Sequence, residues 1–272
     1  MLCSVPGTDV PLSFAGDGAA RAPDGRRFRA LRGVPILRAE PPAAVDKASG
    51  PSSSGVHPDH IAHMDALAGY TLFLGAGNSS FRHPRVIEVE YDLFRDTDVV
   101  ADAHRLPFRS GSFALFFAMN VFEHLRRPEE VAREALRVLE PGGEVHVHTA
   151  FLQPLHEAPR HFYNATEYGV REWFREFEEV ECGVSENFNP LYAIAWLSSE
   201  TITTIEKYAG VEAAREVGSL SLEEVARFWR REDTTGLTAL QHLVKLPEAA
   251  PRPIAAGFEL RARKPCRPPP SA

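Results

Sequence analysis

Short apolar runs alternate with amphipathic stretches through the middle of this 272-residue chain. Runs of roughly four to eight mostly apolar residues predict strands, whereas apolar residues that recur every three or four positions predict helices. By these criteria we expect strands at 70–74, 85–91, 97–102, 113–120 and 144–150, and helices at 57–68, 128–139 and 166–177. Strands that alternate with crossovers in this way predict an α/β fold with a doubly wound, mostly parallel sheet.

The remaining segments suggest how the chain is organised around this sheet. Two further short runs, 178–185 and 257–264, predict two more strands, and the residues between them are mostly helical in pattern. Stretches rich in Gly, Pro and Ser predict linkers and loose ends. We expect a small N-terminal piece at 1–40, a linker or surface tether at 41–58, a main domain at 59–264 with a helical insertion at 190–246, and a loose tail at 265–272.

The stretch LFLGAGNSS, residues 72–80, is an apolar strand that runs into a glycine-containing loop. Gly75 and Gly77 let backbone amides approach a ligand closely, because glycine has no Cβ. In doubly wound sheets, ligands bind beyond the carboxyl ends of the strands. The loop is therefore a candidate ligand site, although a tight turn without a ligand explains the pattern equally well on its own.

The spacing after this loop restricts the kind of cofactor. A dinucleotide site needs a third glycine that opens a helix, but Ser80 stands at that position. Only residues 75–84 separate the two strands, which leaves no room for a full helix whose N-terminus could bind a pyrophosphate. The pattern favours a cofactor with ribose and adenine but no phosphate over a nicotinamide dinucleotide.

Three polar residues end the strands that follow and are candidate cofactor ligands. Glu90 ends the second strand, where a carboxylate can accept hydrogen bonds from both ribose hydroxyls. Asp102 ends the third strand and can accept a hydrogen bond from an adenine amino group. Asn120 ends the fourth strand, beneath the first loop.

The succession LGAG, VIEVEYD, VVADAHRLPFRSGSFALFFAMNVFEHL and EALRVLEPGG resembles the class I S-adenosylmethionine-dependent methyltransferases. It is most similar to their small-molecule, type 11-like branch, and the resemblance covers residues 70–150. It implies a Rossmann-like seven-stranded sheet with an antiparallel last strand, S-adenosylmethionine as cofactor, and enzymatic methyl transfer. The implied cofactor residues are Gly75, Ala76, Gly77 and Asn78 for the methionine part, Glu90 for the ribose, Asp102 and Ala103 for the adenine, and Asn120 beside the sulfonium, with Tyr91 as a further cofactor-binding residue.

The chain departs from the family pattern at two positions that matter for function. The third glycine of the usual G-x-G-x-G motif is Ser79, and the usual acid after the SF dipeptide is Ala114. A non-catalytic protein that binds the cofactor, or a scaffold with an eroded cofactor motif, is therefore the alternative to an enzyme.

The segment after the fifth strand supplies candidate catalytic groups. His156, His161 and Tyr163 follow that strand, where a base for methyl transfer is expected. His156 is the first candidate, because an unperturbed imidazole titrates near neutral pH. A hydrogen bond from His156 to its own loop backbone is the structural alternative.

The sequence gives little support for a bound metal. GVPIL, residues 33–37, resembles the end of a small zinc ribbon that precedes many such domains, but Cys3 alone cannot form a four-ligand zinc site. Glu144, His146 and His148 lie on one face of the fifth strand by their period-two spacing. Such a strand face usually packs against helices, so we expect no metal.

Charge and composition narrow the partners. The net charge of −7 and pI of about 5.9 disfavour a nucleic-acid substrate, as does the absence of an N-P-P-Y or D-P-P-Y motif after the fourth strand. No apolar run is long enough to cross a membrane, and three scattered cysteines fit a reducing compartment. We expect a cytoplasmic enzyme that methylates O or N of a small-molecule or sugar-like acceptor; the oligomeric state is not predicted.

The helical insertion contains a second testable pattern. Ser221 followed by Glu224 predicts a capping box at the start of a helix. The apolar residues of that helix recur at helical spacing, so one face should be buried. We expect 190–246 to cover the acceptor pocket, with a helical extension or dimer surface as the alternative.

Overall fold

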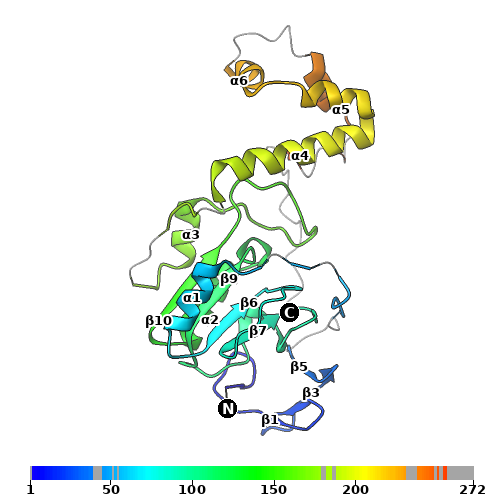
Figure 1. The fold of residues 1–272 in the computed structure, drawn as a ribbon. Helices are drawn as coiled ribbons and strands as arrows, with labels where there is room; N and C mark the ends of the chain where they lie inside the picture. Colours follow the sequence, from blue (N-terminus) through cyan, green and yellow to red (C-terminus); the bar gives the residue numbers. More distant parts are fainter. Residues whose placement is uncertain are drawn as a thin grey trace, which may run out of the picture. The chain divides into compact units, whose positions relative to one another are not determined.

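The computed structural model describes residues 2–38, 45–50, 52–53, 55–178, 182–185, 188–230, 238–247, 250 and 254–255. The chain forms two compact units. The first unit comprises Met1–Phe151 and Pro159–Gly183, and the second comprises Leu152–Ala158 and Val184–Ala272. The positions of these units relative to one another are not determined (Figure 1).

A seven-stranded sheet forms the centre of the first unit, in the order β10-β9-β6-β7-β8-β5-β4 (Figure 1). Neighbouring strands from β10 to β5 pair in parallel, whereas β4 and β5 form an antiparallel pair. The strands are β4 (Ala30–Leu31), β5 (Val34–Leu37), β6 (Thr71–Leu74), β7 (Val86–Glu90), β8 (Val99–Ala101), β9 (Phe113–Met119) and β10 (Leu139–His148). The five strands predicted between residues 70 and 150 are confirmed, as is the mostly parallel sheet.

The two edge strands β4 and β5 come from a part of the chain where the sequence did not predict them to join this sheet. Ile36 and Leu37 pair in parallel with β8, and both side chains are buried. Residues 182–185 of the predicted sixth strand are not in a strand, and 257–264 lies outside the described residues. The sheet is completed by apolar residues of the N-terminal segment, which cover the exposed edge of β8.

The strand order changes direction at β6, which lies between β9 and β7. No helix occurs between β6 and β7, where residues 75–85 form the connection, as the short spacing predicted. Parallel strands point their carboxyl ends to the same edge, so the loops after β6 and β9 leave the sheet side by side at a topological switch point.

Helices cover both faces of this sheet. Helix α1 (Pro58–Ala66) packs Met64 with Phe73 and Phe117 on one face. Helices α2 (Pro128–Val138) and α3 (Glu167–Trp173) lie over the other face, where buried residues of α2 and the partly buried Val170 and Trp173 of α3 pack with Phe116 in the main core. Both faces of β9 are therefore buried, as its unbroken apolar run requires.

The N-terminal residues pack against the same unit. The backbones of Cys3 and Phe108 form an isolated antiparallel β-bridge. Val5 and Leu12 belong to the main core. A small antiparallel sheet follows, made of β1 (Ser13–Phe14), β2 (Ala20–Arg21) and β3 (Arg27–Phe28). Burial raises the pKa of the Cys3 thiol to about 11, so this side chain acts as a small apolar residue in the core.

The second unit is helical in its described part. Its helices are α4 (Pro190–Ala209), α5 (Val211–Gly218), α6 (Leu222–Arg230) and α7 (Gln241–Val244). The predicted capping box is confirmed: the backbone N–H of Glu224 donates to Ser221 Oγ, and the N–H of Ser221 donates to the Glu224 carboxylate. Among the described helices, none has the length and apolar character needed to cross a membrane.

The apolar face of α6 was predicted to be buried, and this prediction is wrong for the described structure. Leu222, Val225, Phe228 and Trp229 are all exposed, with Trp229 at 84%. Helix α6 forms because of its cap and the acids in its first turn.

The core position of Phe117 gives a direct test of the fold. Its side chain is fully buried between Phe73 and His60, so Phe117→Ala should lower the free energy of unfolding by about 3–5 kcal/mol in urea titrations. Phe151→Ala is the matched control, because Phe151 is half-exposed in the same unit, and it should change stability by no more than about 0.5 kcal/mol. Equal losses in the two variants would contradict the described packing.

Candidate cofactor and acceptor site

The loops after β6 and β9 are in close contact at the carboxyl edge of the sheet. Gly75 has φ +75°, and a Cβ at this position would lie 2.3 Å from a methyl carbon of Val121. Only glycine meets both requirements, the left-handed backbone and the close approach. The predicted cofactor loop is therefore held against the start of the β9 loop.

Glu90 connects the end of β7 to this loop. The backbone N–H of Gly77 donates a hydrogen bond to the Glu90 carboxylate. Glu90 is only 6% exposed, and burial raises its pKa to about 8, although the bond from Gly77 partly opposes the shift. The residue predicted to bind the ribose is thus a buried, largely protonated acid near neutral pH.

A second buried acid lies two residues earlier on the same face of β7. Burial raises the pKa of Glu88 to about 7, and the nearby Arg82 lowers it in part. The pKa values of both carboxyl groups are raised, so the surroundings of this end of β7 disfavour negative charge.

The segment that precedes α1 lies over the cofactor loop through Lys47 and Ser53. The N–H of Asn78 donates to Ser53 Oγ at 2.8 Å, and its side-chain amide donates to the carbonyl of Lys47 at 3.0 Å. A Cβ at Gly77 would lie 2.2 Å from Ser53 Oγ. Asn78, predicted to line the methionine part of the cofactor, is 2% exposed and holds this covering segment in place.

Tyr91 lies between two guanidinium groups. The Arg38 guanidinium carbon is 4.2 Å from the centre of the Tyr91 ring, and that of Arg160 is 5.2 Å from it. The neighbouring Asp92 is buried and forms ion pairs with Lys47 and Arg160. Arg160 comes from the loop after β10, so this pairing joins two loops at the carboxyl edge of the sheet.

Asp102 begins a short 3-10 helix, η1 (Ala103–Arg105), at the end of β8. Its Oδ1 accepts hydrogen bonds from the backbone N–H and from the ring Nδ1 of His104. Burial of Asp102 acts to raise its pKa, but the hydrogen bonds from His104 outweigh burial, and the pKa is lowered. Asp102 is therefore ionised and half-exposed beside the buried Ala103, and its contact with an adenine stays a prediction.

Asn120 ends β9 in a left-handed conformation with φ +54°. Its N–H donates to the carbonyl of His148, which ties the end of β9 to the end of β10. Asn tolerates this conformation better than most residues. The turn that follows brings Val121 against Gly75.

Two of the predicted catalytic residues lie near the loop after β9. Phe162 and Tyr163 donate backbone hydrogen bonds to the carbonyl of Glu123, and the ring of His161 lies 5.6 Å from that of His124. The Tyr163 hydroxyl donates to the carbonyl of Arg126. His161 and Tyr163 are therefore held on the carboxyl side of β9.

His156 belongs to the second unit and stays a prediction as a catalytic base. Its Nδ1 lies 2.9 Å from the carbonyl oxygen of Pro154, and its ring packs 5.2 Å from that of Trp196 on α4. The prediction that α4 borders the acceptor pocket likewise stays a prediction, because the two units are not placed relative to one another.

The residues at this edge suit the donor and acceptor pattern of S-adenosylmethionine. Carboxyl groups end the neighbouring strands β7 and β8, at Glu90 and Asp102, and the glycine loop begins at the end of β6. Glu90 Oε1 accepts from Gly77, while Oε2 takes no part in that bond. These acceptor groups suit the hydroxyl and amino groups of the cofactor. Ser53 Oγ also lies against the loop, where it accepts a hydrogen bond from the N–H of Asn78.

Comparison with known proteins points in the same direction. Residues 82–147 match a family model described as a methyltransferase domain, which is less than half of the chain. A search of curated proteins found no match. The first unit therefore has the Rossmann-like α/β fold that the sequence predicted, and residues 82–147 within it are similar to a methyltransferase domain.

Several solved structures are similar over part of the chain. One belongs to a complex with the Haloferax volcanii methyltransferase activator Trm112 (17% identity, 43% of this chain, 66% of that chain, TM-score 0.32). A second is the Haemonchus contortus phosphoethanolamine N-methyltransferase 2 with S-adenosyl-L-methionine (15% identity, 68% of this chain, 48% of that chain, TM-score 0.36). A third is an S-adenosylmethionine-dependent methyltransferase of Mesorhizobium loti (16% identity, 50% of this chain, 87% of that chain, TM-score 0.32). The chain spans 55–66% of the length of the first four structures.

The sequence did not identify two residues that shape this edge, Ser53 and Arg160. Ser53 lies in a Gly/Ser-rich stretch typical of a linker, and Arg160 is one of many arginines in the chain. His124 was suggested by the E-H pair alone, and the structure places its Nδ1 2.8 Å from the carbonyl of Arg160.

The buried carboxyl of Glu90 predicts a pH-dependent cost to stability. The unfolded chain releases this proton near the ordinary glutamate pKa of 4.5 and the folded chain near 8, so stability falls as pH rises between these values, by about 1.4 kcal/mol for each pH unit. Glu90→Gln keeps an acceptor for Gly77 and removes the charge. It should melt at a higher temperature than the wild type at about pH 8.5 and equally at about pH 4.5.

The exposed Glu140 provides the control for this measurement. Glu140→Gln should leave the melting temperature unchanged at both pH values. If Glu90→Gln melted below the wild type at high pH, Glu90 would be an ionised, stabilising group, contrary to its surroundings.

Proposed function

We propose that the protein transfers a methyl group from S-adenosylmethionine to O or N of a small-molecule or sugar-like acceptor. The observation that carries this proposal is the meeting of the glycine loop, Glu90 and Asp102 at one edge of a sheet with the methyltransferase strand order. The match of residues 82–147 to a methyltransferase domain supports it.

Each end of the cofactor has a residue suited to it. Glu90 would accept hydrogen bonds from the ribose hydroxyls, which favours its ionised form, and Tyr91 lies beside it. Asp102 and Ala103 would contact the adenine, and Asn120 would lie beside the sulfonium. The cofactor supplies an electrophilic methyl group, so the chain itself has to align an acceptor and, where needed, remove its proton.

His161 is the best supported candidate for that proton transfer. Its Nε2 lies 3.1 Å from the carbonyl oxygen of Tyr163, and donation to this oxygen makes Nδ1 the basic nitrogen of the neutral ring. His161 belongs to the same unit as the cofactor edge, and His156 does not. His161 is therefore the first residue to test as a base.

One observation favours the alternative of a non-catalytic cofactor-binding or scaffold protein. The amides of Gly77 and Asn78 already donate to Glu90 and Ser53, so the loop is satisfied by the chain itself. Incubation with S-adenosylmethionine labelled in its methyl group and a small-molecule extract separates the two functions. An enzyme produces S-adenosylhomocysteine and a labelled product, whereas a scaffold releases neither.

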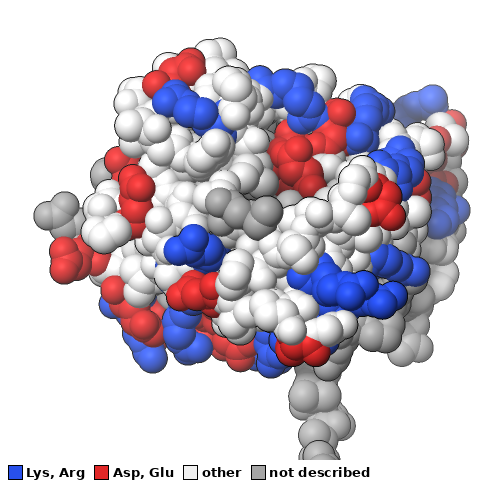
Figure 2. Space-filling view, turned by 90° about the horizontal axis from the view of Figure 1, so that it is seen from below, with Lys and Arg blue, Asp and Glu red and all other residues white. Residues whose placement is uncertain are grey.

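The surface is consistent with a small-molecule acceptor. On the face drawn in Figure 2, acidic and basic residues are interspersed, without a broad basic area of the kind that binds nucleic acid. With a net charge of −7, this supports the expectation that the acceptor is not a nucleic acid.

Cofactor affinity should depend on the ionisation of Glu90. In calorimetry, wild-type affinity for S-adenosylmethionine should rise between about pH 7 and pH 9, because a carboxylate accepts the ribose hydrogen bonds better than a carboxylic acid. Glu90→Gln should bind at least about tenfold more weakly at pH 9 and lose this dependence.

Glu88→Gln is the matched control, since Glu88 is a buried acid on the same strand with its own raised pKa. It should keep wild-type affinity at about pH 9, where Glu90 is largely ionised in both proteins. Unchanged affinity of Glu90→Gln would remove Glu90 from the cofactor site.

A further inference from the structure

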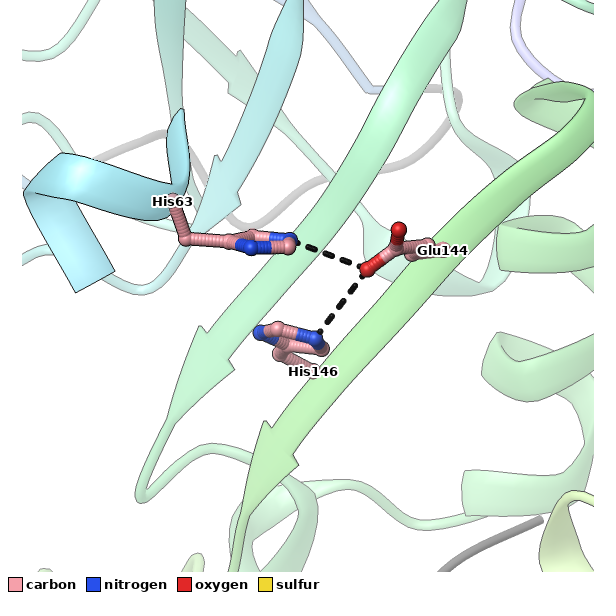
Figure 3. A group of neighbouring side chains, drawn as sticks. All are labelled: His63, Glu144 and His146. Atoms are coloured by element: carbon pink, nitrogen blue, oxygen red, sulfur yellow. Dashed lines mark hydrogen bonds and ion pairs between the residues drawn. The ribbon is translucent and has the colours of Figure 1, made fainter. Parts of the chain in front are cut away.

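A group of metal-ligating side chains lies at the contact between α1 and β10, away from the cofactor edge. His63 comes from α1, and Glu144 and His146 come from β10 (Figure 3). His63 Nε2 is 2.9 Å and His146 Nε2 is 3.4 Å from the same oxygen, Glu144 Oε2. The ligand atoms of the three side chains all lie within 4.8 Å of one another.

We propose that His63, Glu144 and His146 bind one zinc ion that joins α1 to β10. Zinc bonds to imidazole nitrogen and carboxylate oxygen are about 2.0–2.2 Å long, which puts tetrahedral ligand atoms about 3.3–3.5 Å apart. The separations of both imidazole nitrogens from Glu144 are close to this range, and both nitrogens point to one carboxylate oxygen. A small movement of the Glu144 side chain would open the central position.

The chemistry of these side chains fits a borderline cation better than Mg²⁺ or Ca²⁺. Two imidazoles and one carboxylate are typical of zinc sites with three protein ligands, and the hard cations prefer oxygen alone. The three side chains are 34%, 45% and 37% exposed, which leaves a path for the ion and room for a water ligand.

The residues around this group also favour a cation at the contact. One turn before His63, His60 packs 5.2 Å from His148, the next inward residue on this face of β10. The rings of His63 and His146 stack at 4.7 Å. Apolar side chains would pack α1 on the sheet at lower cost, because stacked imidazoles must stay neutral or repel each other. A shared cation that accepts a lone pair from each neutral ring would offset this cost.

The register of the sheet places this zinc site at some distance from the predicted cofactor loop. Glu144 is level with Leu115 and Thr71, at the start of β6. The cofactor loop begins at Gly75, four residues further, which is about 13 Å at 3.3 Å per residue. The zinc would therefore hold α1 on β10 without touching the reacting groups, and this inference does not depend on the proposed function.

The test is calorimetric titration of chelator-treated protein with zinc. Wild-type protein should bind one ion, and His63→Ala, Glu144→Ala and His146→Ala should each bind at least about tenfold more weakly. Mg²⁺ should not compete. The melting temperature of each variant in chelator is first compared with that of the wild type, to show which variants fold without metal. The zinc affinities of the variants that fold, at least two of the three, then test the proposal.

His242→Ala is the matched control, because His242 forms a similar 2.9 Å pair with one carboxylate, Glu216, in the second unit. It should bind zinc like the wild type. If it lost as much affinity as the three variants, or if none of them lost any, binding would be adventitious and the proposal would be overturned.

Hydrogen exchange separates the proposed role from surface binding. Zinc should slow exchange of the amides of α1 in wild-type protein and leave them unchanged in His146→Ala. Tight zinc binding without protection of α1 would contradict a cross-link between α1 and β10.

Discussion

The carboxyl edge of the sheet, where the predicted cofactor residues lie, depends on the hydrogen bond from Gly77 to the buried carboxyl of Glu90. This bond ties the end of β7 to the loop after β6, at the position where the strand order changes direction. With the loop fixed there, Gly75 packs on Val121 and Gly77 on Ser53. A larger residue at either glycine would displace the loop, so the glycines serve the chain's own packing as well as ligand approach.

Burial of the two carboxyl groups on β7 lowers the stability of the fold. The apolar core around the sheet offsets this loss. Glu88 and Glu90 are carboxyl groups buried on one face of β7, both with raised pKa values. Residues that disfavour folding are expected at functional sites, where a ligand later satisfies them. In the proposed function, ribose hydroxyls that donate to Glu90 would supply such partners and would account for an acid at a position where an apolar residue would be more stable.

Local patterns predicted the central sheet and the positions of Glu90 and Asp102 at the ends of its strands, and they failed where long-range pairing decides. The strand containing Glu90 and the strand before Asp102 are visible as short apolar runs, and their ends follow directly. Nothing local shows that Ile36 pairs with Val100, or that Ser53 covers the loop. The period-two spacing of Glu144 and His146 was recognised, but His63 was missed because its position depends on how α1 packs.

Helix α1 links the two ends of the sheet. The segment that carries Lys47 and Ser53 covers the cofactor loop just before α1 begins at Pro58, and His63 lies near the other end of the helix, beside β10. His63 lies five residues after Pro58, about 7.5 Å along the helix at 1.5 Å per residue. A cation that fixes one end of this helix lowers the entropy cost of ordering the segment at the other end. Because such coupling is reciprocal, a cofactor that orders the covering segment must strengthen zinc binding by the same factor as zinc strengthens cofactor binding.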